Sequence, residues 1–252
     1  MAPQQLSLPE LAAKIATEGP VKHEPTKRRI RGRVGGRWLF DTTEAEYVWE
    51  HPNYPLFYVP LRALQAGDGK VSQDKPDPRG FWVGTLDAGE AKQIEVAGFD
   101  KGPLSGLVKI PPKSIDAWYA EDEQVLGPHP RDPYKRIECL PSTREVRIEV
   151  DGVEIARGTD NVFLYETGLR PRYYLLSTAV RDWSLLRDSD TTTFCPYKGQ
   201  ASYYHLQVGK RVIQDAVWYY QYPVPESAAV QSRLCFYNEK VDVFIDGKKE
   251  DN

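Results

Sequence analysis

The chain has 252 residues, with 33 basic and 36 acidic side chains and a formal net charge of −3. This length suffices for one large or two small domains, each with its own core. The near balance of charge excludes a global field that would attract nucleic acid or an anionic membrane, so we expect neither as a partner. The apolar runs are too short to span a membrane, and the N-terminus lacks a signal-peptide pattern. The sequence therefore predicts a soluble, cytoplasmic protein.

The three cysteines are Cys139, Cys195 and Cys235, an odd number without close spacing. This pattern argues against a disulfide framework and against a zinc ribbon. Cys139 and Cys235 lie in apolar runs typical of strands, which predicts small buried side chains. We expect no metal and no other cofactor.

The N-terminal segment predicts one short amphipathic helix. Ser7 and Glu10 have the spacing of a capping box, and apolar residues follow at helical intervals until Gly19. This helix either plugs the end of a sheet, which we favour, or acts as a lid or partner contact. The basic run 27–33 has the composition of a nucleic-acid patch, but its alternation with apolar residues favours an exposed strand face.

Most of the remaining chain has the pattern of strands and turns. Gly35-Gly36 and Asp151-Gly152 each separate two short apolar runs, which predicts two β-hairpins. Only one further short helix is indicated, at 225–230, and the Gly, Asp, Lys and Pro residues of 67–78 predict an exposed loop. The predicted fold class is mainly β.

The two hairpins begin two copies of one unit. Aligning Gly36 with Gly152 sets an offset of about 116 residues and brings Glu50 onto Glu166 and Tyr58 onto Tyr174. Near the end of each unit, Ala117-Trp118-Tyr119-Ala120-Glu121 parallels Cys235-Phe236-Tyr237-Asn238-Glu239. An internal duplication accounts for these matches and predicts two related small β-rich domains.

The proline-rich segment 127–133 marks the expected boundary between the copies. We therefore predict an N-terminal helical extension at 1–21, a degenerate β-rich repeat at 22–126, and an intact β-rich repeat at 127–252. Arg170 and Arg172 of the second copy correspond to Tyr54 and Leu56 in the first, which also lacks the run 195–199. We therefore expect that the first copy has lost the functional residues. It is then either a scaffold or one wall of a pocket shared with the second copy.

The second copy gathers charged groups of both signs, a thiol, glycines and tyrosines between 165 and 225, a mixture typical of a lined pocket. The candidate catalytic residues are Lys198, Glu166, Asp215 and Cys195. The candidate substrate-binding residues are Arg170, Arg172, Tyr173, Tyr174, Tyr197, Gly199, Trp218 and Tyr220.

These residues carry a resemblance to a known family. Val150-Asp151-Gly152, Tyr165-Glu166-Thr167-Gly168, Arg170-Pro171-Arg172-Tyr173-Tyr174, Cys195-Pro196-Tyr197-Lys198-Gly199, Asp215-Ala216-Val217-Trp218 and Phe236-Tyr237 follow the order found in the domain of unknown function 427. The chain resembles that family strongly over 129–247 and more weakly over 22–125. The resemblance implies a small β-rich domain of the β-tent group and a label of nucleotidyltransferase type. The metal-binding cysteine pairs of many β-tent proteins are absent, so we expect no structural zinc.

Each charged candidate has a structural alternative. Lys198 either binds an anion or supplies a reactive amine, or it is a solvated turn lysine. Glu166 is either a general base or a structural partner of an arginine. Asp215 either moves a proton or forms a turn, and Cys195 needs a base, for which His205 is the nearest histidine in sequence.

The two arginines flank Pro171, which restricts the residue before it to extended geometry. We therefore expect the guanidinium groups to diverge, with one of them gripping a carboxylate or phosphate.

Three functions remain open from the sequence. The first is a metal-free enzyme that acts by acid/base chemistry on a small carboxylated or carbonyl-containing metabolite, with Arg172 and Lys198 holding the anionic group. The second is a nucleotide-binding or nucleotidyltransferase-type protein. The third is a non-catalytic ligand-binding or interaction module. All three predict a small, anionic ligand or a partner rather than nucleic acid or a membrane.

Overall fold

The computed structural model describes residues 6–67, 69–89 and 92–251. The chain divides into two compact units, unit 1 at Met1–Asp132 and unit 2 at Pro133–Asn252. The division lies inside the proline-rich segment 127–133, and residues 127–132 belong to unit 1. Both units are mainly β, as the sequence predicts.

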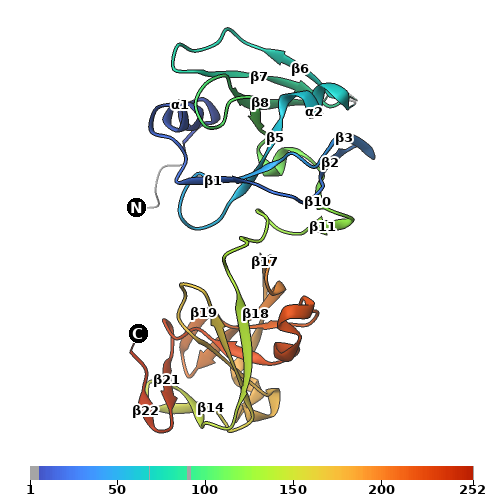
Figure 1. The fold of residues 1–252 in the computed structure, drawn as a ribbon. Coiled ribbons are helices and arrows are strands. Elements are labelled where there is room, and N and C mark those ends of the chain that lie inside the picture. Colours follow the sequence, from blue (N-terminus) through green and yellow to red (C-terminus); the bar gives the residue numbers. More distant parts are fainter. Residues whose placement is uncertain (1–5, 68, 90–91, 252) are drawn as a thin grey trace. The chain divides into compact units, whose positions relative to one another are not determined.

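Unit 1 contains, over its described residues, a seven-stranded antiparallel sheet in the order β1-β4-β5-β9-β8-β7-β6 and a four-stranded sheet in the order β11-β10-β2-β3 (Figure 1). Its elements are α1 (Leu8–Glu18), β1 (Lys22–Pro25), β2 (Ile30–Val34), β3 (Arg37–Thr42), β4 (Glu46–Trp49), β5 (Leu56–Pro60), α2 (Leu61–Ala66), β6 (Lys70–Gln73), β7 (Phe81–Asp87), β8 (Gln93–Phe99), β9 (Leu107–Lys109), η1 (Pro112–Ser114), β10 (Ala117–Ala120) and β11 (Glu123–Val125).

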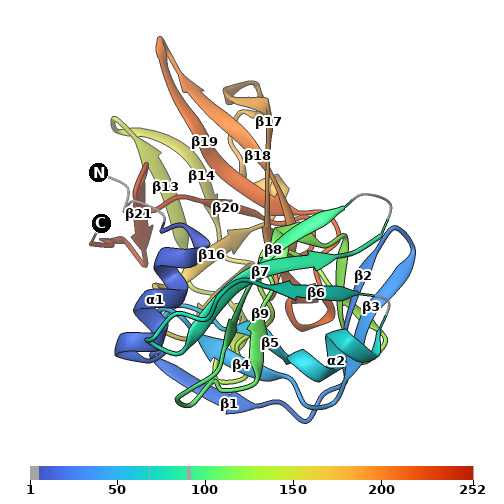
Figure 2. The same cartoon turned by 90° about the horizontal axis from the view of Figure 1, so that it is seen from above.

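Unit 2 repeats this arrangement, with the orders β12-β15-β16-β20-β19-β18-β17 and β14-β13-β21-β22. Its elements are β12 (Ile137–Ser142), β13 (Val146–Val150), β14 (Val153–Gly158), β15 (Asn161–Glu166), β16 (Arg172–Leu175), η2 (Ser177–Ala179), η3 (Trp183–Leu185), β17 (Leu186–Cys195), β18 (Gly199–Val208), β19 (Arg211–Tyr220), η4 (Pro225–Val230), β20 (Leu234–Phe236), β21 (Asp242–Ile245) and β22 (Lys248–Lys249). Strands β17 to β19 are its longest, and Figure 2 shows β18 and β19 as an extended ribbon.

The strand order is the same in both units, so each strand of unit 1 has a counterpart in unit 2. This identity confirms the predicted duplication and corrects one of its alignments. Residues 117–120 form β10, in the smaller sheet, whereas residues 234–236 form β20, in the larger one. The counterpart of β20 is β9, so the similarity between 117–121 and 235–239 in sequence does not reflect equivalent positions.

Both predicted hairpins form for the expected reason. Asp151 and Gly152 have φ values of 51° and 78°, a left-handed pair that glycine favours at its second position. The predicted N-terminal helix is α1, and the Ser7 and Glu10 capping box is present. The short helix predicted at 225–230 is present and is a 3-10 helix. One other expectation needs correction, because 67–78 includes the strand β6, paired with β7.

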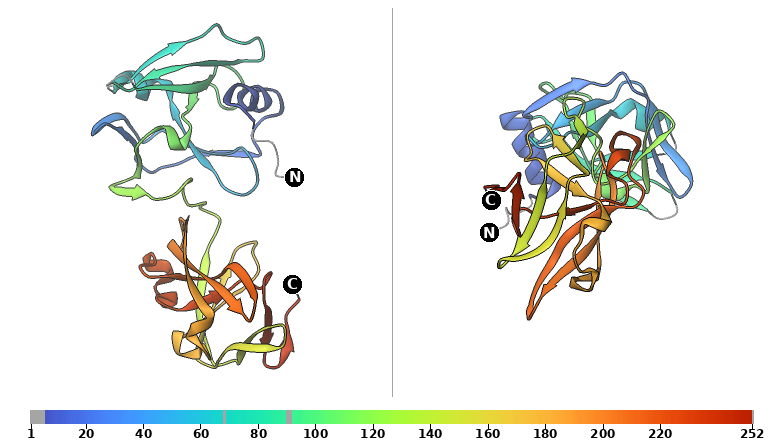
Figure 3. Two further views of the ribbon diagram at one scale, coloured as in Figure 1. Left: turned by 180° about the vertical axis from the view of Figure 1, so that it is seen from behind. Right: turned by 90° about the horizontal axis from the view of Figure 1, so that it is seen from below.

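Each unit has two apolar layers. One lies between its two sheets, and the other covers the opposite face of the seven-stranded sheet. In unit 1 this outer layer is closed by α1, whose Ala12 and Ile15 are buried in a cluster with Phe81 and Phe99; Figure 3 shows the helix beside its unit. In unit 2 the outer layer combines four aromatic side chains with smaller side chains of the sheet and with Val230 of η4; the four are Tyr174, Tyr203, Trp218 and Tyr220. None of the helices in the described segments is long and apolar enough to cross a membrane.

Candidate functional site

The floor of the candidate site is a row of paired residues on the outer face of the larger sheet in unit 2. Tyr174 pairs with Cys235, Cys235 with Trp218, and Trp218 with Tyr203. Side chains of directly paired residues lie on the same face of a sheet. We call these four residues the central row of unit 2. All four are buried, and the Trp218 indole donates a hydrogen bond of 3.1 Å to the Tyr174 hydroxyl.

Tyr220 joins the same face because it lies two residues after Trp218 on β19. It is buried in the same apolar cluster as the central row. Tyr173 does not join it. This residue lies next to Tyr174 on β16, so its side chain points to the opposite face, between the two sheets, where its hydroxyl donates to Glu250 at 2.8 Å. The prediction of Tyr173 as a substrate-binding residue conflicts with this orientation, since alternation along a strand separates the two tyrosines.

Lys198 and Glu166 form an ion pair above this floor. Lys198 lies in the turn between β17 and β18, and Glu166 is the last residue of β15. Only 13% of the lysine side chain and 10% of the glutamate side chain are exposed. Both are predicted site residues, but the structural partner predicted for Glu166 is an arginine, whereas its partner in the structure is Lys198.

The turn that carries Lys198 is held by backbone contacts. Its amide donates to the Cys195 carbonyl at 3.1 Å, and its own carbonyl accepts from Val224 at 3.1 Å. Gly199 has a φ of 99°, and an added Cβ would lie 3.1 Å from the Tyr222 carbonyl oxygen. The carbonyl of Tyr197 accepts from the Ser227 hydroxyl at 3.3 Å. These contacts fix the lysine in place, with Tyr197 acting through its backbone.

Arg170 and Arg172 converge on one carboxylate rather than diverge. Arg172 makes two hydrogen bonds to Glu239, at 2.9 and 3.0 Å, and Arg170 reaches the same side chain at 3.4 Å. The hydrogen bond from Arg172 holds the pKa of Glu239 at about 2. The Arg172 guanidinium also lies over the rings of Trp218 and Tyr237, with its carbon 5.5 and 5.6 Å from their centres. Both arginines are therefore engaged by an internal carboxylate, at the edge of the aromatic floor.

Asp215 lies away from the Lys198–Glu166 pair. It precedes Tyr220 by five residues on β19, a separation of about 16 Å along an extended strand. Its carboxylate accepts hydrogen bonds from Ser189 at 2.6 Å and from Thr191 at 3.0 Å, and the Ser189 bond lowers its pKa. The Asp215 amide donates to the His205 ring at 2.9 Å. Asp215 thus connects irregularities in β17, β18 and β19 rather than joining the other candidates.

The cysteines do not form a catalytic pair with histidine. Cys195 pairs with Gly199, and His205 lies six residues further along β18, about 20 Å away. All three cysteines are free, and burial raises the pKa of the thiols of Cys139 and Cys235. Across the described residues, no cluster of three histidine, cysteine or acidic side chains has a metal-binding arrangement.

Comparison with known proteins identifies the family. The model described as domain of unknown function 427 matches residues 22–74 and 138–247. The chain belongs to this family. No curated protein matches it. The segment of unit 2 matched to domain of unknown function 427 contains every candidate site residue named above, whereas the segment in unit 1 ends shortly after β6.

Unit 1 contains, at the matching place, an ion pair that the sequence does not predict. Glu50, the counterpart of Glu166, pairs with Lys109 of β9, and the Tyr58 hydroxyl donates to Glu50 at 2.9 Å. Lys109 is 5% exposed, and burial lowers the pKa of its ammonium group against the opposite effect of Glu50. By strand register Lys109 corresponds to Cys235, not to Lys198. It lies beyond the matched family segment, and its only sequence signal is a lone lysine in the apolar run 107–110.

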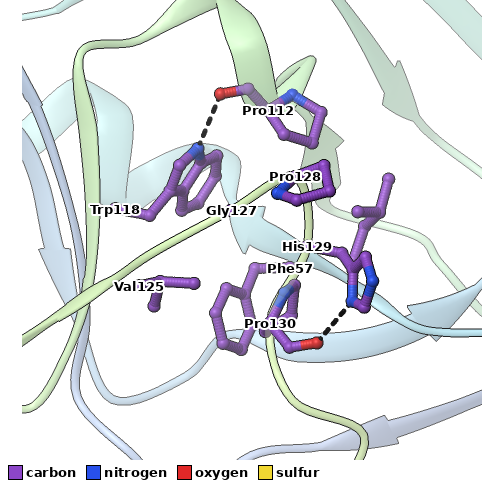
Figure 4. Close-up of a pocket in the computed structure, with 9 residues that line it drawn as sticks. Phe57, Pro112, Trp118, Val125, Gly127, Pro128, His129 and Pro130 are labelled. Atoms are coloured by element: carbon purple, nitrogen blue, oxygen red, sulfur yellow. Dashed lines mark hydrogen bonds between the residues drawn. The ribbon is translucent and has the colours of Figure 1, made fainter. Parts of the chain in front are cut away.

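A separate hollow lies in unit 1 beside the segment 127–130 (Figure 4). It has a volume of about 270 Å³, including open solvent, and is lined by Leu56, Phe57, Pro112, Trp118, Val125, Gly127, Pro128, His129 and Pro130. The His129 ring stacks on Tyr54 with 3.9 Å between ring centres, and its Nδ1 lies 2.8 Å from the Pro130 carbonyl oxygen. The lining is almost entirely apolar, so this hollow lacks the paired charges found in unit 2.

Proposed function

We propose that unit 2 binds a small carboxylated or carbonyl-containing molecule at Lys198 and Glu166, and that this pair moves a proton in its conversion. The observation that carries the proposal is the ion pair itself. An ammonium and a carboxylate in contact provide a proton donor and a proton acceptor at one point, and burial strengthens their interaction with a bound molecule.

The surroundings of the pair support this assignment. Tyr174, Trp218 and Tyr220 supply a broad aromatic floor, and small-molecule sites in proteins commonly combine such a lining with a few fixed polar groups. The turn that carries Lys198 is held by backbone hydrogen bonds and by Gly199, so the amine is positioned before any ligand arrives.

The other candidates take supporting roles or none. Arg172 lies at the edge of the floor, and its partner Glu239 remains 46% exposed, so an anionic ligand can compete with that carboxylate. Cys195 contributes the carbonyl that fixes the turn. Asp215 acts at the distant irregular segment, and we propose no proton transfer through it.

A non-catalytic binding module is the second candidate. The observation that favours it is that Lys198 and Arg172 are both already paired with internal carboxylates, which is typical of structural ion pairs. In that case the same molecules bind without turnover. We also propose a cytoplasmic location, which the three free cysteines support.

The test is a thermal-shift screen against small keto acids, other carboxylic acids, and nucleotides with and without magnesium. A ligand well above its dissociation constant raises stability by about 3 kcal/mol, which is measurable as a shift in Tm. The variant is Lys198→Met with Glu166→Gln, which removes both charges together and so leaves no unpaired buried ion. The control is Lys249→Met with Asp242→Asn, which removes an ion pair of unit 2 that lies outside both sites.

We expect organic acids to raise the Tm of the wild type and of the Lys249 and Asp242 control equally, and to raise that of the Lys198 and Glu166 variant by less. Turnover assays on those acids then separate the enzyme from the binding module. A shift by nucleotides alone would replace the proposal with nucleotide binding. Equal ligand shifts in both double variants would return Lys198 and Glu166 to a structural role.

A further inference from the structure

On the face of unit 1 that corresponds to the candidate site, Lys109 lies on β9, next to β8, which together with β7 contacts α1. Tyr58 pairs with Lys109, Lys109 with Ala97, and Ala97 with Val83. We call these four residues the central row of unit 1. Directly paired side chains lie on one face, so Lys109 projects from the same face of the sheet as Tyr58 and Ala97. That face is the one covered by α1, because Tyr58 and Ala97 belong to the same apolar cluster as Ala12 and Ile15 of the helix.

The two central rows differ in the space that they leave. Ala97 and Val83 in unit 1 correspond to Trp218 and Tyr203 in unit 2. In unit 2 the two aromatic side chains are buried in the outer layer together with Val230 of η4. In unit 1 the small side chains leave room, and α1 occupies it. The helix therefore takes the volume in which a ligand or a large side chain would otherwise lie.

Helix α1 is held on this face by apolar contacts. Among the described residues, 8–18 make no hydrogen bond or ion pair to the sheet, since the cap of Ser7 and Glu10 and the bond from Thr17 to Ala13 are all local. The first bond to the sheet comes after the helix, where the Val21 amide donates to the Trp49 carbonyl at 2.9 Å. This bond tethers the end of the helical segment next to Glu50.

Such a helix can leave the face without unfolding the sheet. It has 11 residues, of which Ala12 and Ile15 are buried and four more are partly buried against the same cluster. Helices of fewer than about 12 residues are marginal in water without packing. Within the described segments, no strand of the sheet shares a backbone hydrogen bond with α1. Segments with few buried contacts open locally at a lower free energy than the sheets that they cover.

We propose that unit 1 holds a second site, formed by Lys109, Glu50 and Tyr58, for a small carbonyl compound, and that α1 is the lid that closes it. The ligand class is that proposed for unit 2 and rests on that proposal. When the lid opens, the Lys109 ammonium gives a proton to Glu50, and the neutral amine adds to the carbonyl carbon. Loss of water from this adduct leaves an imine on Lys109.

The test uses glyoxylate, a small carboxylated aldehyde, together with cyanoborohydride. Glyoxylate forms an imine with an accessible amine and releases water, and hydride from cyanoborohydride reduces the imine to a stable carboxymethyl-lysine. Peptide mass spectrometry then reports the rate of modification at each lysine. The lid variant is Ile15→Asp, which places a charge in the apolar contact, and the matched control is Lys14→Asp on the exposed side of the same helix.

We expect Lys109 to be modified at least about tenfold faster in Ile15→Asp than in Lys14→Asp, a ratio consistent with a shift in local opening. Exposed lysines such as Lys101 and Lys210 should react equally in both proteins. Equal rates at Lys109 in the two variants would overturn the proposal. The function of unit 2 is judged separately, by the ligand shifts of the Lys198 and Glu166 variant, so either proposal can fail alone.

If Ile15→Asp does not fold, amide hydrogen exchange of the wild-type protein tests the lid instead. The lid requires the amides of 12–18 to exchange through local opening, at a lower free energy and with weaker denaturant dependence than those of β7 and β8. Exchange of α1 only together with the two strands would show that the helix is an integral part of the core, and would overturn the lid.

Discussion

Gly199 and Gly168 both have positive φ, yet a side chain would meet different surroundings at the two positions. An added Cβ lies 3.1 Å from a backbone oxygen at Gly199, whereas nothing lies within 4 Å at Gly168. Substituting the two glycines therefore distinguishes two free-energy costs of adding a side chain. One is the cost of a left-handed backbone conformation, and the other is the cost of a Cβ close to a backbone oxygen. Gly199 matters to the site because it adjoins Lys198.

Gly199→Ala is expected to lower the free energy of unfolding by about 2 to 3 kcal/mol, since it combines both costs. The control Gly168→Ala should lower it by about 1 kcal/mol, the cost of the backbone conformation alone. Urea denaturation of the two variants measures the difference. If both variants lose the same free energy of unfolding, the turn around Lys198 is able to shift and does not hold the lysine in one position.

Glu239 provides a prediction about pH. Its pKa is lowered from 4.5 to about 2, chiefly by the hydrogen bond from Arg172. A carboxylate with a lowered pKa in the folded state contributes stability above its unfolded pKa and loses it as the pH falls through the folded value. The contribution of Glu239 is thus complete above pH 4.5 and is lost towards pH 2.

Glu239→Gln is therefore expected to be less stable than the wild type at pH 7 and equally stable at pH 2. Because the side chain is 46% exposed, the difference at pH 7 should be no more than about 1 kcal/mol. Urea denaturation at several pH values measures it. A difference that persists unchanged at pH 2 would show that the glutamate acts through packing rather than through its charge.

At the scale of elements, the irregular segment of β17, β18 and β19 distinguishes unit 2. The pairing of β17 with β18 shifts between Asp188 and Thr192, and that of β18 with β19 shifts between Tyr204 and Leu206. Asp215 lies at this point with a φ of 48° and bonds to His205 of the neighbouring strand β18 and to Ser189 of β17, one strand further. The corresponding pairs of unit 1, β6 with β7 and β7 with β8, are regular.

Asp215→Asn should lower the free energy of unfolding by about 1 to 3 kcal/mol. Asparagine tolerates the left-handed backbone conformation, but its amide has one oxygen and cannot accept both the Ser189 and the Thr191 hydrogen bond as the carboxylate does. The control is Asp190→Asn, an exposed residue of the same segment. Thermal denaturation of both variants tests the structural role. An unchanged Tm with loss of ligand conversion would instead give Asp215 the catalytic role that the sequence suggests.

At the scale of the whole molecule, the two units have separate cores. Each apolar cluster draws its residues from one unit only. Two cores of this kind are the mark of two domains, each able to fold by itself. The duplication therefore produced a second domain with its own core, and it did not enlarge the core of the first domain.

Residues 133–252 expressed alone are expected to fold and to unfold cooperatively on heating. Circular dichroism during thermal denaturation measures this, with the full chain for comparison. A gradual loss of signal without a transition would mean that unit 2 needs unit 1, and the two would then count as one domain.

The sequence by itself predicts the features that depend on neighbouring residues. The capping box of α1, the hairpin at Asp151-Gly152 and the mainly β class follow from local spacing and turn chemistry, and the duplication follows from an ungapped offset. The orientation of Tyr173 was also within reach, since alternation along a strand separates it from Tyr174.

The tertiary structure decided which charged groups meet. Glu50 and Glu166 occupy equivalent places, but their lysines come from a strand in unit 1 and from a turn in unit 2, 59 and 32 residues away in sequence. Such contacts depend on strand order, on cross-strand register and on where a turn places its side chains. None of these properties produces a recognisable pattern among neighbouring residues in the sequence. For the same reason the match between 117–121 and 235–239 misled the alignment, because similar residues can serve different strands when packing, rather than spacing, sets their partners.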